Sequence, residues 1–175
     1  MSGEKVFAVW VTGIPSSGKS SITRELVACL NRRGISPAVL ESDTLRTILT
    51  PEPTYLHVER DRFYLQLAEL GTMLARQGIP VIFDATANRQ AYRDHARTQI
   101  TRFVEVFVNC TVDICSDRDP KGIYASAFRG AATNVPGLQS VYEQPAAPEM
   151  TVDCRDAPAV SAEKIVAYLM ANRYL

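Results

Sequence analysis

Apolar residues follow two alternating patterns along the chain, one typical of buried strands and the other of amphipathic helices. A nearly continuous apolar run at residues 6–12 predicts a strand that is covered on both faces of a sheet. Further strands are predicted at residues 38–40, 79–83, 103–108 and 150–152. Helical spacing of apolar residues predicts helices at residues 19–33, 59–76, 90–101 and 111–118, followed by a last helix after Ser161.

The order of these elements predicts an α/β fold. Strands that alternate with helices favour a three-layer architecture, in which an open, mainly parallel sheet carries helices on both faces. We interpret residues 1–175 as a single domain, since this length suits one core. Residues 119–149 are rich in glycine, proline and small residues, and they are too many for an ordinary connection, so a mobile lid is predicted there.

Several side chains are expected to serve the core. Trp10 lies in the first predicted strand, and Ser161 is placed to cap the last helix. The inner faces of the helices are expected to carry Phe63, Leu67, Leu70 and Leu74, then Tyr92, Ala96 and Ile100, and finally Ile165, Val166, Leu169 and Met170.

Charge and composition narrow the classes of partner. Lysine plus arginine and aspartate plus glutamate both number 19, so no overall field attracts long nucleic acids. No segment approaches the length of a membrane span, and residues 1–11 show no secretory pattern, so a cytoplasmic protein is expected. His57 and His95 form no metal or catalytic set. The four cysteines lack metal-binding spacing and are expected to be buried, inert thiols rather than disulfides.

Residues 13–20, with the sequence GIPSSGKS, match the phosphate-binding P-loop pattern between a strand and a helix. Gly13 and Gly18 allow the backbone amides to curl around phosphate, and the helix dipole adds positive potential. We expect Lys19 to bridge the outer phosphates and Ser20 to bind Mg²⁺. The nucleotide-binding residues predicted in this segment are Gly13, Ser16, Ser17, Gly18, Lys19, Ser20 and Ser21. ATP and Mg²⁺ are therefore the expected cofactors.

Polar residues after the next two strands indicate where an acceptor would bind. The chain lacks a guanine-specific N-K-x-D motif and is small, which favours a fold like that of the nucleoside-monophosphate kinases. Asp43 could accept the proton of the acceptor hydroxyl and Arg46 could bind an anionic group, although a helix cap and a solvated arginine are alternatives. Asp84 could act as a base, hold the water ligands of the metal, or stabilise a turn. Arg89 and Arg93 could contact an anionic acceptor or lie on a solvated helix face.

Two motifs make the chain resemble the adenylylsulfate kinases, which phosphorylate the 3′-hydroxyl of adenylylsulfate in sulfate assimilation. Residues 118–124 are similar to the family's R-D-x-K-G-L-Y, and residues 142–149 to its Y-E-x-P-x-x-P-E. Residues 40–46 correspond to L-D-G-D-N-x-R, and the pair at 59–60 to the family's D-R. The resemblance implies an ATP-dependent phosphotransferase, and a homodimer. It also implies that Asp43 lies near the acceptor hydroxyl and that Lys121 lies on the lid. Taken together with the patterns above, we predict catalytic roles for Lys19, Asp43 and Lys121 and nucleotide contact by Arg118. The residues predicted to contact a small anionic substrate are Asp43, Arg46, Arg60, Asp84, Arg89 and Lys121.

The chain departs from the family where the acceptor would bind. Phe63, Leu65 and Gln66 stand where the family has an asparagine and two arginines. Val135 replaces an aromatic residue that packs on the substrate adenine, and residues 126–128 replace a K-A-R triplet. Losing such contacts costs about 1 to 3 kcal/mol each. Two alternatives therefore stay open: a kinase for another small hydroxyl compound, such as a nucleotide or sugar, and a nucleotide-binding regulator without transfer.

Overall fold

A five-stranded, fully parallel sheet forms the centre of the molecule. The computed structural model describes residues 6–175, so the first five residues of the segment examined for a secretory pattern lie outside the described part. The strands follow the spatial order β2-β3-β1-β4-β5. Their bounds are β1 Ala8–Thr12, β2 Ala38–Glu41, β3 Val81–Asp84, β4 Phe103–Asn109 and β5 Met150–Asp153. The predicted α/β class and the parallel sheet are confirmed.

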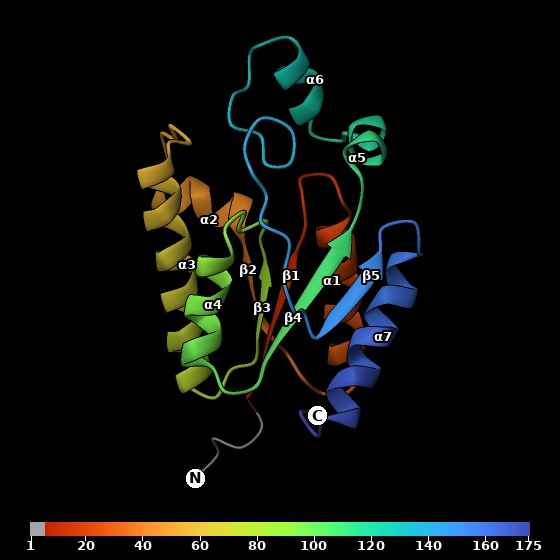
Figure 1. Cartoon of the computed structure of the whole chain (residues 1–175). Helices are drawn as coiled ribbons and strands as arrows, with labels where there is room; N and C mark the ends of the chain where they lie inside the picture. The colour runs from red at the N-terminus through yellow and green to blue at the C-terminus, as the bar shows by residue number, and fades with distance from the viewer. Residues whose placement is uncertain (1–5) are drawn as a thin grey trace.

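Helices cover both faces of this sheet, as predicted (Figure 1). Helices α2, α3 and α4 lie on one side and helices α1 and α7 on the other, while α5 and α6 lie beyond the carboxyl ends of the strands. The bounds are α1 Lys19–Asn31, α2 Ser42–Leu49, α3 His57–Arg76, α4 Gln90–Gln99, α5 Val112–Arg118, α6 Ile123–Phe128 and α7 Pro158–Ala171. The helix bounds place the starts of α1, α2 and α5 at the same edge of the sheet.

Two apolar clusters fill the spaces between the sheet and its helices. In one of them Trp10 is fully buried and stacks on Phe83 with 4.3 Å between ring centroids. Phe63 and Leu67 of α3, and Tyr92, Ala96 and Ile100 from α4 and its end, are buried in the same cluster, as their spacing predicted. Burying apolar area at about 25 cal/mol per Å² is the main force that holds these helices on the sheet.

Three local predictions were wrong or incomplete. Ser161 does not cap the last helix, because α7 begins at Pro158 and Ser161 is buried within it. Met170 is 55% exposed, and Ala162 takes a place on the inner face instead. Helices α2 and α6 were not predicted.

The cysteine prediction needs correction as well. Cys110 and Cys154 form a disulfide, with 5.3 Å between their Cα atoms, while Cys29 and Cys115 are free and buried. The two bonded residues follow β4 and β5, which pair side by side. The sheet therefore brings together two thiols that lie 44 residues apart in sequence.

Arg93 is neither a solvated residue nor available to an acceptor, because it is fully buried. Its guanidinium forms an ion pair with Glu105 at 2.5 Å and donates to the carbonyl oxygens of Ala87 and Glu143. Arg97 adds a second cation to Glu105. Arg93 thus ties α4 to β4, to the loop after β3 and to the segment that precedes β5.

None of the helices in the described residues is long and apolar enough to cross a membrane.

Candidate active site

The P-loop has the backbone geometry that its sequence predicts. It connects β1 to α1, and Gly18 at the start of α1 has a φ of +102°. A Cβ atom on Gly13 would lie 2.8 Å from the Ser17 Oγ atom and 2.9 Å from the Val108 carbonyl oxygen. Ser16 also adopts a left-handed conformation, with a φ of 61°. Such conformations favour glycine and recur where the backbone must bend around a ligand.

Polar groups in this loop are prepared for an anion. The hydroxyl oxygens of Ser16 and Ser17 are buried and have no hydrogen-bond partner within residues 6–175. The Lys19 Nζ atom donates to the carbonyl oxygens of Gly13 at 3.0 Å and Ile14 at 2.9 Å. Burial lowers the pKa of Lys19, and the nearby Asp84 and Asp43 oppose this shift. Buried donors without partners are costly, so this arrangement fits a polyphosphate that would bind them.

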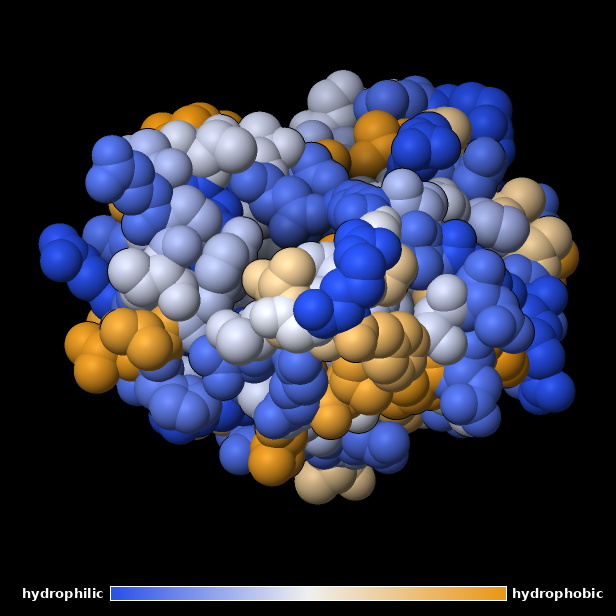
Figure 2. Space-filling model, turned by 90° about the horizontal axis from the view of Figure 1, so that it is seen from above, coloured by the Kyte–Doolittle hydropathy of each residue, from blue (hydrophilic) through white to orange (hydrophobic). Residues whose placement is uncertain are grey.

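A cavity of about 520 Å³ opens above the loop. Its volume lies within the usual range for a small-molecule site. The face that contains the carboxyl edge of the sheet is mostly hydrophilic (Figure 2). The walls come from the P-loop and the start of α1, the ends of β2 and β3, the segment after α5 and the residues after β5. Of the predicted site residues, they include Ser16, Ser17, Gly18, Lys19, Ser20, Ser21, Asp43, Asp84, Arg118 and Lys121.

Asp43 and Lys121 meet across the mouth of this cavity. Asp43 lies in the first turn of α2, and Lys121 precedes α6 in the 119–149 segment. The two side chains form an ion pair, although 63% of Asp43 and 53% of Lys121 remain exposed. The hydrogen bond to Asp43 raises the pKa of Lys121. Because the pair is exposed, its own contribution to stability is small. The pair matters for the geometry of the site, because it joins the Asp43 carboxylate at the sheet edge to the Lys121 ammonium from the segment above it.

Asp84 occupies a different environment at the end of β3. It is 4% exposed and lines the same cavity. Burial raises the pKa of its carboxyl group, whereas Lys19 and the Ser20 hydroxyl oppose that rise. The carboxylate therefore lies on the phosphate side of the cavity, while Asp43 lies at its mouth.

Two buried arginines form a cationic cluster beside the cavity rather than in its wall. Arg46 lies 3.9 Å above the centre of the Phe63 ring and 5.2 Å from that of Tyr55. Its carboxylate partner is Glu59, at 3.4 Å. Arg60 donates to the Asn134 carbonyl oxygen at 2.6 Å, and it forms no ion pair with any carboxylate in residues 6–175. Burial lowers the pKa of Arg60.

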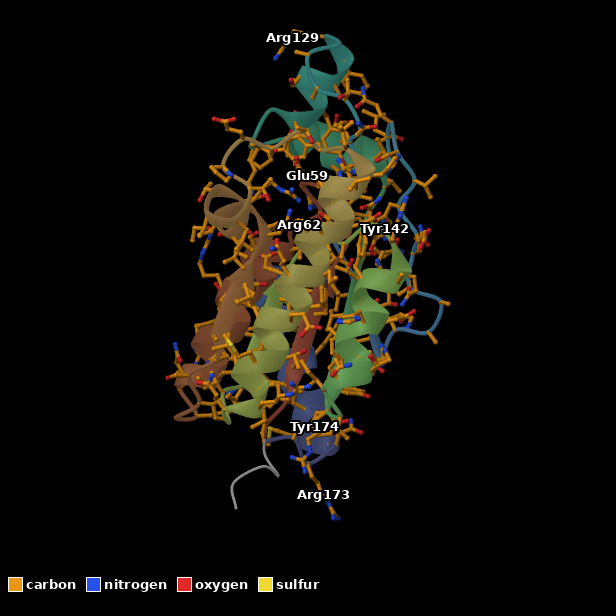
Figure 3. All side chains as sticks on the ribbon, turned by 90° about the vertical axis from the view of Figure 1, so that its left-hand side faces the viewer. Glu59, Arg62, Arg129, Tyr142, Arg173 and Tyr174 are labelled. Carbon is orange, nitrogen blue, oxygen red and sulfur yellow. A yellow bond between two sulfur atoms is a disulfide. The ribbon has the colours of Figure 1, made fainter. Side chains whose placement is uncertain are left out.

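Figure 3 shows this part of the molecule from the side of α3, with Glu59 at the upper end of that helix, below the segment that carries Arg129. The cluster therefore lies at the junction of α2, α3 and the segment of residues 119–149. One excess positive charge in a buried position favours an anionic ligand.

Arg89 has a separate set of partners. Its guanidinium donates to Asp61 at 3.0 Å, and the Tyr92 hydroxyl donates to the same carboxylate. Its side chain is 40% exposed and is absent from the cavity wall. The structure therefore does not bring Arg89 together with the other predicted site residues.

Sequence reasoning missed one wall of the cavity. Residues 154–158, which follow β5, line it together with the P-loop. The Arg118 guanidinium donates to the Cys154 carbonyl oxygen at 2.8 Å, which holds the plane of Arg118 against this loop. No local motif marks residues 154–158, although their place after the last predicted strand at the carboxyl edge was a usable signal.

Comparisons with known proteins identify the family to which the chain is similar. The model of the adenylylsulphate kinase family matches residues 5–153. An adenylyl-sulfate kinase of Microcystis aeruginosa is 38% identical over 84% of this chain and 80% of its own length. A probable bifunctional SAT/APS kinase 2 of Sorangium cellulosum is 35% identical over the whole chain, which spans only 30% of that protein.

Solved structures also include an adenylylsulfate kinase that is similar to this chain. The APS kinase CysC of Mycobacterium tuberculosis, solved in complex with AMPPNP and APS, superposes with a TM-score of 0.89. It is 30% identical, and the match covers 95% of this chain and 98% of that one. A sugar kinase from Janibacter sp. HTCC2649, at a TM-score of 0.64 and 17% identity, shares the fold alone.

Proposed function

Because the chain belongs to the adenylylsulfate kinase family, we propose that it transfers the terminal phosphoryl group of ATP to the 3′-hydroxyl of adenylylsulfate. The supporting observation is one cavity with a phosphate loop at one end and the Asp43–Lys121 pair at its mouth, next to buried arginines. Relatives named as adenylyl-sulfate kinases align over most of their own length. The reaction requires both parts of this arrangement: the phosphate loop, which would bind ATP, and the Asp43–Lys121 pair with the arginines, which would bind the acceptor.

On the nucleotide side, the P-loop binds the polyphosphate of ATP through its amides and through the free hydroxyls of Ser16 and Ser17. Lys19 exchanges its two carbonyl partners for phosphate oxygens, and its charge stabilises the negative charge that builds up during transfer. Arg118 and residues 154–158 provide the surface on which the adenine rests.

The residues present also fit a magnesium ion. Ser20 follows Lys19 in the cavity wall, and Asp84 supplies a buried carboxylate near it. Mg²⁺ prefers oxygen ligands and usually combines one or two protein groups with phosphates and water. When bound, the ion would neutralise charge on the phosphates and lower the repulsion that an incoming oxygen meets.

On the acceptor side, Arg60 and Arg46 bind the phosphosulfate group of adenylylsulfate, and Tyr55 offers an aromatic face for its adenine. Asp43 orients the 3′-hydroxyl and accepts its proton, while the ion pair with Lys121 positions the carboxylate. Movement of residues 119–149 admits the substrates and then excludes water from the reaction.

A second candidate is transfer to a different small hydroxyl compound. Phe63 lies directly under Arg46, so the acceptor pocket is more apolar there than a phosphosulfate site requires. Val135 is an aliphatic residue without an aromatic ring, and it is 4% exposed in a cluster with Ile14 and Tyr124, so this position offers no stacking surface to a base. These two positions favour an acceptor that carries less negative charge than adenylylsulfate, or one that has no base to stack on a second aromatic side chain.

Coupled ADP release separates the two candidates. The protein is assayed with ATP, Mg²⁺ and a panel of acceptors: adenylylsulfate, AMP, gluconate and a simple sugar. The proposed function predicts that kcat/KM is highest for adenylylsulfate. Turnover with another member of the panel and none with adenylylsulfate would instead establish the second candidate. ADP binding without turnover on any acceptor would indicate a nucleotide-binding regulator.

Replacing Arg60 with methionine tests the acceptor side alone. We expect KM for adenylylsulfate to rise roughly ten- to a hundredfold, because a buried charge-assisted contact contributes about 1.5 to 3 kcal/mol. The affinity for ADP should stay within about twofold, since Arg60 is absent from the nucleotide cavity. Arg62→Met, an exposed position on the same helix, is the matched control. An unchanged KM in Arg60→Met would remove Arg60 from the acceptor site.

We further propose that residues 1–175 act as one kinase domain, that the protein is cytoplasmic, where ATP is available, and that two copies associate as a homodimer. Light scattering of the purified protein measures the last point directly.

A further inference from the structure

The Cys110–Cys154 disulfide lies at the carboxyl edge of the sheet, beside the nucleotide cavity. Asn109, the last residue of β4, is in register with Asp153, the last residue of β5, and one of the two cysteines follows each of them directly. The Cys154 amide donates to the Asn109 carbonyl oxygen at 3.1 Å. Figure 1 shows the two segments that leave these strands, one rising to α5 and the other turning back into α7. The bond therefore joins two segments at the point where they leave the sheet.

Both of these segments contribute to the wall of the cavity. Residues 154–158 line it directly, and Arg118, at the end of α5, lines it as well. The Arg118 guanidinium donates to the Cys154 carbonyl oxygen at 2.8 Å. Two links therefore connect the segment after β4 to the segment after β5: the disulfide at Cys110 and this hydrogen bond at Arg118.

Residues 155–158 have few other links to the site. Within residues 6–175, their hydrogen bonds and ion pairs reach only residues 153–164. Arg155 pairs with Asp153, and Asp156 pairs with Lys164 of α7 at 2.8 Å. A segment that is held by so few groups moves readily when one of them is lost. The disulfide is the covalent anchor at the start of this segment.

A disulfide is unexpected in a protein that works in the cytoplasm, as we propose for this one. Reducing compartments keep most thiols reduced, and the disulfides that form there are usually redox-sensing or catalytic. Cys110 is partly exposed, whereas Cys154 is 7% exposed, so attack from solution falls on the Cys110 sulfur. Burial raises the pKa of the free Cys115 thiol, which makes it a poor attacking group. The reductant therefore comes from solution.

We propose that this disulfide is a redox switch that sets the affinity for the nucleotide. In the oxidised protein, Arg118 and residues 154–158 are held in place as a wall for the base. In the reduced protein this wall is free to move, so the nucleotide must order it on binding, and its affinity falls. The switch rests on the proposed function for the presence of a nucleotide, and it adds a means of regulating that same site.

The chemistry of the switch is thiol–disulfide exchange with glutathione or with a protein dithiol. A thiolate attacks the Cys110 sulfur, the bond between the two cysteine sulfurs breaks, and Cys154 leaves as a thiolate that takes up a proton. A second thiolate then attacks the external sulfur of the mixed disulfide and releases Cys110, which is protonated in turn. Two electrons and two protons thus reach the two cysteines, while two external thiols become one disulfide.

Calorimetric titration of ADP with Mg²⁺ tests the switch, on protein oxidised with glutathione disulfide and on protein reduced with dithiothreitol. We expect the Kd for ADP to rise roughly three- to tenfold on reduction, because the ligand must then order the wall. Cys110→Ser should bind ADP like the reduced protein under both conditions. Cys29→Ala is the control: it removes a buried thiol of α1 that lies outside the cavity wall, so it should keep the wild-type response.

Equilibration in glutathione buffers separates a switch from a fixed structural bond. After rapid alkylation of free thiols, mass spectrometry measures the fraction of protein in which Cys110 and Cys154 carry the label. The switch predicts that this fraction changes within the range of glutathione ratios found in cells, at a temperature at which the protein stays folded. A purely structural bond would instead lower the melting temperature on reduction and leave the Kd for ADP of the folded protein unchanged.

Three results would overturn the proposal. They are an equal Kd for ADP in the oxidised and reduced protein, a bond that no glutathione ratio reduces, and two cysteines that stay reduced in excess glutathione disulfide. Binding of ADP that is independent of the redox state would remove the switch alone. If neither form of the protein bound ADP, the proposed function would fail and the switch with it.

Discussion

Replacing Lys19 with alanine is expected to lower kcat for phosphoryl transfer by about a thousandfold, because it removes the main positive charge on the transferring group. The buried Lys19 ammonium lies in the cavity wall, where its two partners are backbone carbonyls rather than carboxylates. It can therefore move to phosphate oxygens without breaking an ion pair. Initial rates of ADP formation, at saturating ATP and acceptor, measure this effect.

Arg24→Ala is the matched control for this variant. Arg24 lies on α1, the helix that begins at Lys19, but its side chain is exposed. The Arg24→Ala substitution removes one positive charge from the same helix but leaves the cavity unchanged. The kcat of this variant should therefore stay within about twofold of the wild type. If Lys19→Ala retained wild-type transfer with the best acceptor, the assignment of residues 13–20 as the phosphate site would be wrong.

Replacing Arg93 with alanine is expected to cost about 3 to 5 kcal/mol of unfolding free energy, because Glu105 would be left as an uncompensated buried charge. Both residues of the pair are almost completely buried. Arg93 also satisfies the carbonyl oxygens of Ala87 and Glu143, which would lose their donor. Urea denaturation should therefore show a much lower midpoint, and the melting temperature should fall by roughly 10 °C.

Two further variants test the cause of this loss. Arg97→Ala removes the second partner of Glu105, but its side chain is 32% exposed, so the loss should be about 1 kcal/mol. The double variant Arg93→Met with Glu105→Leu removes both charges and should recover part of the stability that Arg93→Ala loses. A loss in Arg93→Ala no larger than in Arg97→Ala would contradict the account of the buried pair.

Local patterns were enough to predict the strands, the longer helices and the phosphate loop. Each of these depends on neighbouring residues: Gly13 and Gly18 set the turn, and the spacing of Phe63 and Leu67 sets a helix face. The resemblance to a known family added Asp43 and Lys121 as separate candidate site residues. That their side chains form an ion pair, although they lie 78 residues apart, is visible only in the structure.

The remaining features depend on the packed fold. The disulfide exists because β4 and β5 pair, and the sequence spacing of Cys110 and Cys154 does not reveal this. Arg93 has the sequence appearance of a surface residue, yet its partners come from three segments that meet only in three dimensions. Tyr55 was overlooked because it lies in an irregular loop, and only the fold brings its ring close to Arg46 and Arg60.

The most direct test of the central claim is the position of the phosphate in the product. Purified protein is incubated with ATP, Mg²⁺ and adenylylsulfate, and the product is examined by ³¹P NMR and mass spectrometry. We expect one new phosphomonoester on the 3′-oxygen of adenylylsulfate, formed in equal amount to ADP. Free phosphate as the only product, or a phosphate at another position, would contradict the proposed function.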